Sequence, residues 1–463
     1  QPMGIIVSLG GQTPLKLAAT LPPELIAGTS PASIDLAEDR EQWNALCRDL
    51  GIPQPPGGTA VDADGALTIA AQVGYPVLVR PSYVLGGRAM EIIYDDAQMV
   101  RAMAEMSDFG SLGIEGGLSA ERPVLVDRFL EDATEVDVDA VRDRLGDVMI
   151  GAVMEHVEEA GVHSGDSACV IPPPHLSASV VARIEDHTLA IAEALDVRGP
   201  INVQFAVKDD EVYVIEANPR ASRTVPFVAK ATGVPLAKVA SRVMMGATLA
   251  ELRDEGLLCE RVVGDHVAVK EAVLPFNRFP EADPVLGPEM RSTGEVMGID
   301  LTTGLAFMKS QISAGGALPE SGTVFLSLAD RDKVVGLEAA RGLQDLGLDV
   351  VATSGTAEYL RANGVPVDTV VAKLGEEGTD AVELVRSGAV QMVVNSPRGR
   401  GPRADGEHIR AAAGAQGIPL MTTANAALAA ARGLADWQRF PLAVRTLQEY
   451  HRGVRRSEQE VVR

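Results

Sequence analysis

The stretch NVQFAVKDDEVYVIEANPRASR, residues 202–223, decides the fold of this chain. NVQFAV alternates polar and apolar side chains, KDD is typical of a turn, and EVYVIEA runs back, so the stretch predicts a β-hairpin. Because side chains two apart on a strand share a face, Gln204 lies with Asn202, and Glu216 lies with Asn218. The apolar residues between them supply the opposite, packing face.

Polar groups concentrate at the end of the second predicted strand, where Glu216 and Asn218 lead into Arg220 and Arg223. Magnesium that bridges nucleotide phosphates is bound by one or two carboxylates, by amide oxygens and by water. Arginine forks match the oxygens of a small anion or a phosphoryl group. An isolated Glu-x-Asn could be a solvated hairpin end, but the density of polar groups favours a metal–phosphate site that includes Gln204.

The composition predicts a globular protein of more than one domain, since 463 residues exceed one ordinary core and 46% of them are hydrophobic. The 41 basic and 64 acidic residues give a net charge of −23, which argues against nucleic-acid binding. The three cysteines form no CxxC, as expected for reduced thiols. Without a membrane-spanning run or a signal peptide, we expect a cytoplasmic protein.

The start of the chain predicts the end of an α/β domain, because residues 4–9 read as a strand that is followed by a glycine turn and a helix. Its earlier strands are missing, so we expect a fragment of a longer polypeptide. Residues 35–50 are predicted as one helix with Trp43 and Leu46 on its inner face, and residues 53–64 as a loop.

A second candidate phosphate contact is VRPSYVLGGRAMEI, residues 79–92. A glycine turn between two strands can cover phosphates with its backbone N–H groups, while Arg80 and Arg88 offset their charge. The segment is not GxxxxGK[ST] and is therefore not a P-loop. Hairpins use glycine in any case, so the argument depends on the arginine of the preceding strand.

Acidic residues alternate along EVDVDAV, residues 135–141, and so share one face of a predicted strand. Glu135 is the first candidate ligand there, ahead of Asp137 and Asp139, although such a row could also be the solvent face of a sheet. The following MEHVEEAGVHSGDSA, residues 154–168, is dense in small and hydrogen-bonding side chains, which is typical of functional loops.

The C-terminal third predicts a small parallel α/β domain. Strands are expected at 323–328, 348–352 and 390–395, with helices at 331–346 and 356–363 between them.

Polar residues follow these strands at the edge where parallel sheets bind ligands. Thr353 and Thr356 come after one strand and Asn395 ends another, and Lys333 and Lys373 could join them on a phosphate. Serine, threonine and glycine at strand-to-helix turns also serve as simple caps, and the pattern alone does not separate the two interpretations.

Taken together, long motifs across the chain resemble the large subunit of carbamoyl phosphate synthetase, in its C-terminal half. The resemblance covers nearly the whole chain. The motifs are SLGGQTPLKLA (8–18), VRPSYVLGGRAMEI (79–92), EVDVDAV (135–141), MEHVEEAGVHSGDSA (154–168), NVQFAV (202–207), EANPRASRTVPFVAKATGVPLAKVA (216–240) and GPEMRSTGEVMG (287–298).

The resemblance implies a fold of mixed α/β and α+β class. It predicts an ATP-grasp fold with the remnant of a pre-ATP-grasp α/β domain, followed by a methylglyoxal-synthase-like regulatory domain. The implied segments are 1–37 (partial pre-ATP-grasp domain), 38–275 (ATP-grasp), 276–318 (connection), 319–450 (regulatory domain) and 451–463 (charged tail).

The resemblance also implies site residues and cofactors. The nucleotide would be surrounded by Arg80, Arg128, Leu130, Glu135, Gly161, Val162, His163, Ser164, Gln204 and Glu216. Mg²⁺ or Mn²⁺ would be held by Gln204, Glu216 and Asn218, and the catalytic set would be Arg220, Arg223, Glu216 and Asn218. A monovalent cation, K⁺, would lie near Glu158, Glu159 and the loop 161–164.

In the regulatory domain the resemblance implies an effector phosphate site. Its residues would be Lys333, Thr353, Thr356, Lys373 and Asn395. The following PRGRGPRADG departs from the threonine-rich form of that loop, so the identity of the nucleotide effector stays open.

The implied activity is ATP-dependent phosphorylation of carbamate to carbamoyl phosphate, feeding pyrimidine and arginine synthesis. The implied partners are a glutaminase small subunit, the missing N-terminal half of the large subunit and a nucleotide effector, assembled as an oligomer of heterodimers. The alternatives are another ATP-grasp carboxylate–amine ligase, or an inactive nucleotide-binding and regulatory fragment.

Overall fold

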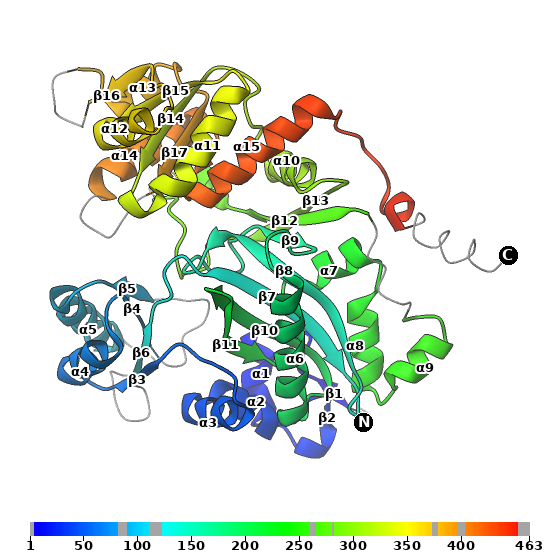
Figure 1. The fold of residues 1–463 in the computed structure, drawn as a ribbon. Helices are drawn as coiled ribbons and strands as arrows, with labels where there is room; N and C mark the ends of the chain where they lie inside the picture. The colour runs from blue at the N-terminus through cyan, green and yellow to red at the C-terminus, as the bar shows by residue number, and fades with distance from the viewer. Residues whose placement is uncertain are drawn as a thin grey trace. The chain divides into compact units, whose positions relative to one another are not determined.

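A computed structural model describes residues 4–81, 90–111, 123–258, 265–279, 282–372, 378–396 and 403–451 (Figure 1). Contacts divide the chain into two units. The first comprises Gln1–His156, Val170–His266 and Val444–Arg463, and the second Val157–Cys169 and Val267–Ala443. The five segments expected from the sequence stay predictions.

The predicted hairpin is present in the first unit as β10 (Gly199–Lys208) and β11 (Glu211–Asn218), which pair antiparallel. Asp209 and Asp210 form its turn with φ values of 52° and 61°, as a two-residue hairpin turn requires. Next to β10 lie β7 (Thr134–Arg142) and then β8 (Val148–Glu159).

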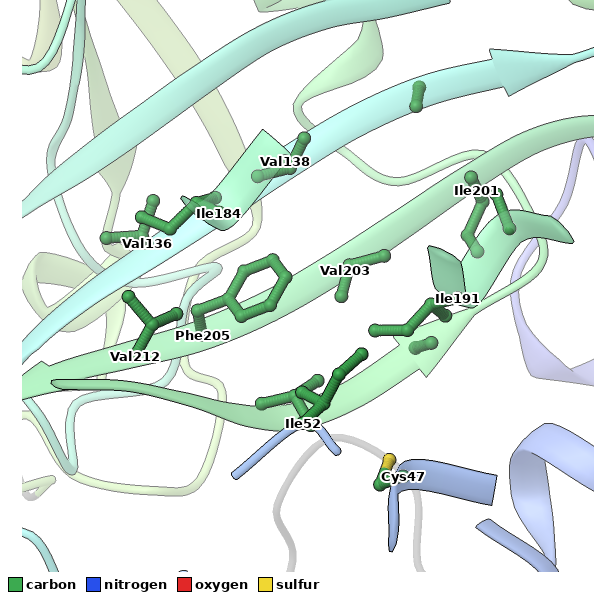
Figure 2. Packing of buried hydrophobic residues seen from close by; sticks show 14 of the residues in the cluster. Cys47, Ile52, Val136, Val138, Ile184, Ile191, Ile201, Val203, Phe205 and Val212 are labelled. Atoms are coloured by element: carbon green, nitrogen blue, oxygen red, sulfur yellow. The ribbon is translucent and has the colours of Figure 1, made fainter. Parts of the chain in front are cut away.

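The apolar face of this sheet forms the core of the first unit, as Figure 2 shows. Val203 and Phe205 are fully buried on β10, with Val212 beside them on β11. They pack against α6 (Ala178–Ala194) and α3 (Arg40–Leu50), whose buried residues belong to the same cluster. Because side chains alternate along a strand, this burial turns Asn202 and Gln204 to the other face.

Two local predictions were wrong. The helix expected at 35–50 is two helices, α2 (Pro31–Glu38) and α3, because Asp39 leaves the helical conformation and its carboxylate caps Gln42 N. The loop expected at 53–64 contains β3 (Gly57–Ala60), whose glycines hide the strand signal.

A separate four-stranded sheet has the order β3-β6-β4-β5. Its other strands are β6 (Val124–Arg128), β4 (Val77–Pro81) and β5 (Glu91–Ile93), with α4 (Ala63–Val73) and α5 (Asp96–Ser111) as helices. The glycine turn with Arg88 lies outside the described residues. The first unit also contains α1 (Gln12–Ala18), the parallel pair β1 (Ile5–Ile6) and β2 (Ile26–Ala27), and α7 (Val225–Thr232), α8 (Leu236–Met244) and α9 (Leu249–Asp254).

The parallel α/β domain predicted for the C-terminal third is confirmed in the second unit. The sheet has the order β16-β15-β14-β17-β18, and its neighbouring strands pair parallel. Its strands are β14 (Thr323–Leu328), β15 (Asp349–Thr353), β16 (Thr369–Val371), β17 (Met392–Ser396) and β18 (Leu420–Met421). Its helices are α11 (Lys333–Asp345), α12 (Ser354–Ala362), α13 (Ala381–Arg386), α14 (Arg403–Gln416) and α15 (Ala424–Arg439).

The rest of the second unit joins an antiparallel pair to a helix. β12 (Val267–Val273) pairs with β13 (Gly294–Asp300), and α10 (Thr303–Ala314) follows. The short strand β9 (Cys169–Ile171) begins at Cys169, where the segment Val157–Cys169 of the second unit ends. Among the described residues, no helix has the length and apolarity that crossing a membrane requires.

Candidate functional site

A polar face covers three neighbouring strands of the first unit. Glu216 on β11 lies directly opposite Gln204 on β10, and Gln204 lies opposite Asp137 on β7. The register of the hairpin shifts after Gln204, so a β-bulge adjoins this row. Bulges commonly redirect side chains next to functional sites. The row therefore places carboxylate and amide oxygens from three strands on one surface, the ligand type that Mg²⁺ prefers.

A second row runs beside the first, with Asn218 opposite Asn202 and Asn202 opposite Asp139. Asp139 is buried and accepts hydrogen bonds from Asn202 Nδ2 (3.0 Å) and from the hydroxyls of Ser222 and Thr224, the latter at 2.6 Å. Burial raises the pKa of Asp139 to about 6, despite these donors. Asp139 thus anchors the segment that follows β11 onto the sheet.

Two arginines flank the Glu216 carboxylate. Arg80 at the end of β4 lies 3.8 Å from Glu216 Oε2, and Asn218 Nδ2 donates to Glu216 Oε1 at 2.9 Å. Arg220 Nη2 donates to Asn218 Oδ1 at 3.1 Å. Burial lowers the pKa of the Arg220 guanidinium from its normally very high value. Arg223 is exposed just beyond. The structure therefore brings together the residues that the sequence singled out as a metal–phosphate site.

Sequence reasoning missed the residues that hold Arg80. Asp127 on β6 lies 3.9 Å from Arg80 and accepts from Arg40 Nη2 at 2.7 Å. The three side chains are mostly shielded from solvent. Nothing local marks Arg40, because the contact joins positions 87 residues apart in the chain.

His156 on β8 was also missed as a neighbour of the polar face. Its ring is buried, and its Nε2 lies 3.1 Å from Asp137 Oδ2. Its Nδ1 lies 3.7 Å from Glu135 Oε2. Glu135, the favoured acidic candidate, lies opposite Ala206 on β10 and so belongs to the same face. The alternating acids are therefore not the solvent face of the sheet, since Asp137 and Asp139 are almost fully buried.

A cavity of about 300 Å³ lies at the turn end of the hairpin. Arg128 and Leu130, two predicted nucleotide contacts, line it together with Lys208 and Tyr213. The Arg128 guanidinium itself donates to Tyr75 O at 2.6 Å, so its charge is directed at the main chain. The cavity and the Glu216 row occupy opposite ends of the same hairpin.

The predicted nucleotide loop Gly161–Ser164 belongs to the second unit. His163 N donates to Gly287 O at 2.8 Å, and Ser164 O accepts from Lys270 Nζ at 3.0 Å. The loop is therefore held by the chain segment before β13 and by β12.

Buried and half-buried carboxylates adjoin this loop. Glu158 accepts from the Ser167 hydroxyl and from Ala168 N, both at 2.7 Å. Burial raises the pKa of Glu159 to about 7, and burial with the nearby charge of Glu158 raises that of Glu271 to about 8. Carboxylates crowded in this way favour a bound cation.

The effector residues gather at the carboxyl edge of the parallel sheet. β14 lies between β15 and β17, so the order of strands reverses there, which is where open α/β sheets bind ligands. Lys373 lies outside the described residues. The residues at this edge are Lys333, Thr353, Thr356 and Asn395.

Contacts at this edge bear on whether the threonines are only helix caps. Thr353 makes no side-chain cap to α12, and its hydroxyl donates to Thr356 Oγ1 at 3.2 Å. Thr356 Oγ1 also accepts from Leu328 N at 3.0 Å. Lys333 Nζ lies 2.7 Å from Asp330. The side chain of Thr353 therefore does not act as a helix cap.

Comparison with known proteins defines the class of both parts. Residues 39–252 match the family described as carbamoyl-phosphate synthase L chain, ATP binding domain, and residues 336–422 match the MGS-like domain. Each of these two segments is thus similar to the family whose description it matches. The biotin carboxylase domain of 2-oxoglutarate carboxylase from Hydrogenobacter thermophilus shares the fold, with a TM-score of 0.52 and 17% identity over 63% of this chain and 69% of that one.

The particular relatives are carbamoyl phosphate synthase large chains. This chain is 52% identical over 453 residues to that of Gemmatimonas aurantiaca and 53% identical over 468 residues to that of Mycobacterium tuberculosis. Each match covers 97% of this chain and 40% or 41% of the relative, so the chain spans less than half the length of these proteins. The resemblance stated from the sequence is confirmed.

Proposed function

We propose that this chain transfers a phosphoryl group between ATP and carbamate, as part of a glutamine-hydrolysing carbamoyl phosphate synthase large chain. The observation that carries the proposal is the row of Glu216 and Gln204 with Asn218 beside it, flanked by Arg80 and Arg220. The similarity to carbamoyl phosphate synthase large chains supports the choice of carbamate as the acid.

The site residues act by positioning and by charge. Gln204, Glu216 and Asn218 hold Mg²⁺ or Mn²⁺, which when bound neutralises the phosphates. A carbamate oxygen forms the new bond to the γ-phosphorus, the bond to the β–γ bridging oxygen breaks, and ADP leaves. Arg220 and Arg223 offset the charge of the phosphoryl group in transit. Carbamate is already anionic, so no side chain is needed as a general base.

The remaining assignments follow from the same proposal. Arg80 and Glu135 contact the nucleotide, and the cavity at Arg128 and Leu130 takes its base. Gly161, Val162, His163 and Ser164 form the proposed nucleotide loop. K⁺ binds beside Glu158 and Glu159, where burial raises the pKa of Glu159 and of the nearby Glu271.

The proposed partners are a glutaminase small subunit and the rest of the large chain, assembled as an oligomer of heterodimers in the cytoplasm. A nucleotide effector binds at Lys333, Thr353, Thr356, Lys373 and Asn395. The support for this site is its position at the strand-order reversal of an MGS-like domain.

ATP formation from ADP and carbamoyl phosphate tests the proposal directly. The chain is expected to form ATP, and Glu216→Ala to lower the rate by at least about 100-fold while remaining folded, since a charge-stabilising group is lost. Glu193→Gln, which changes an exposed carboxylate on α6, is the control. Unchanged ATP formation by folded Glu216→Ala would contradict the site assignment.

A further inference from the structure

One buried arginine of the second unit joins two regions of proposed function. Arg410 on α14 is fully buried. Its Nη1 donates to Asn395 Oδ1 at 2.5 Å, while Nε and Nη2 donate to the two carboxylate oxygens of Asp283 at 2.7 and 2.6 Å. A buried guanidinium with this bidentate partner has a single favourable geometry.

On one side, Arg410 fixes the amide of Asn395. Because Asn395 Oδ1 accepts from Arg410, the amide presents its Nδ2 donor elsewhere, the group that suits phosphate oxygens. The packing is close: a Cβ on Gly406 would lie 2.6 Å from Arg410 Nη1 and 3.1 Å from Asn395 Oδ1. Gly406 therefore leaves the space in which the two side chains meet.

On the other side, Asp283 begins a segment, residues 283–292, that continues to the nucleotide loop. Gly287 O accepts from His163 N at 2.8 Å. Further along, Arg291 N and Ser292 N donate to the two carboxylate oxygens of Asp166 at 2.7 and 2.8 Å. The segment thus contacts His163 within the loop and Asp166 two residues beyond it, all within the same unit of the chain.

We propose that Arg410 is a positioning residue that ties the effector site to the nucleotide loop through segment 283–292. The inference rests on the proposed effector and nucleotide sites. A ligand that orders Asn395 favours one position of Arg410, and through Asp283 it favours one position of the Gly287 carbonyl that holds His163. Coupling of this kind is reciprocal, so nucleotide at the loop also changes effector affinity. Neither Arg410 nor Asp283 touches substrate in this account.

Asp283→Asn tests the tie with little change in shape, because it removes the charge and one of the two acceptors for Arg410. Hydrogen–deuterium exchange of the full chain is the first measurement and needs no ligand. We expect exchange at the amides of His163, Arg291 and Ser292 to rise on the order of 10-fold as local opening becomes easier. Glu338→Gln is the matched control, because it breaks an exposed ion pair with Arg432 in the same unit. Exchange at these amides equal to that in Glu338→Gln would overturn the proposal.

The second measurement separates the tie from the effector site itself. Nucleoside 5′-monophosphates are the probes, with calorimetry for binding and the apparent KM for ADP in ATP formation for coupling. Coupled sites typically change each other's affinity by about 5- to 150-fold. In Asp283→Asn we expect the probe still to bind, but to change the KM for ADP by no more than about 2-fold. A full effect in the variant would overturn the tie. Absence of probe binding to the parent chain would refute the effector site, and the exchange result alone would then decide whether the tie exists.

Asp283→Glu and Gly406→Ala guard against a trivial loss of folding. Asp283→Glu keeps the charge and should restore most of the coupling. Gly406→Ala leaves every charge in place but displaces Arg410 Nη1, and should weaken the coupling as Asp283→Asn does. Full coupling in folded Gly406→Ala would count against Arg410 as the link.

Discussion

Asp139→Asn should change how the stability of the first unit depends on pH. Burial raises the pKa of Asp139 from 3.8 to about 6. A pKa that is higher in the folded state stabilises the fold while the group is protonated, and this contribution is lost as the pH rises through 6. A shift of about two pKa units corresponds to roughly 3 kcal/mol in the free energy of unfolding. About 2 kcal/mol of this contribution is lost between pH 4.5 and pH 7.5. Asparagine cannot ionise, and the hydroxyls of Ser222 and Thr224 can rotate to accept from its amide.

The assay is urea unfolding followed by tryptophan fluorescence. In a Trp437→Phe background, Trp43 remains as the single tryptophan and reports on the core of the first unit. Between pH 4.5 and 7.5 the parent should lose about 2 kcal/mol more stability than Asp139→Asn. Asp186→Asn, at an exposed position of α6, should follow the parent. Parallel pH profiles for the parent and Asp139→Asn would refute the reasoning.

Three further changes have defined outcomes. Phe205→Ala should lower the free energy of unfolding of the first unit by about 3–5 kcal/mol, because it empties a fully buried position, and Phe205→Leu by much less; urea unfolding measures both. Glu271→Gln should lose less stability than the parent as the pH rises through 8, because Glu271 then no longer ionises beside Glu158; thermal unfolding at pH 6 and 9 checks the sign. Arg40→Ala should raise the KM for ADP in ATP formation, since Asp127 is then left to compete for Arg80; a KM equal to that of the parent would exclude this positioning role.

The parts of the site that local sequence defines were predicted well. Alternation and turn residues place Gln204 and Glu216 on facing strands, and the structure has them directly opposite each other. The parallel C-terminal domain follows in the same way from strands that alternate with helices. In both cases the signal lies within a few residues of the element that it predicts.

The parts that depend on strand register or on distant contacts were not predicted. The position of Asp137 beside Gln204 requires β7 to be the neighbour of β10, which no local pattern specifies. Arg40 and His156 enter the site through contacts between separate elements. Arg410 carries no signal either, because the sequence shows only a basic residue in a helical segment.

The most direct test of the central claim is binding of Mn²⁺ together with ATP, followed by electron paramagnetic resonance. The parent chain should bind the Mn²⁺–ATP complex. Glu216→Gln should weaken this binding at least about 10-fold, because the charged oxygen ligand from β11 is lost. Glu193→Gln should bind as the parent does. Equal affinity in the parent and Glu216→Gln would contradict the claim that the polar face of the hairpin holds the metal and the nucleotide phosphates.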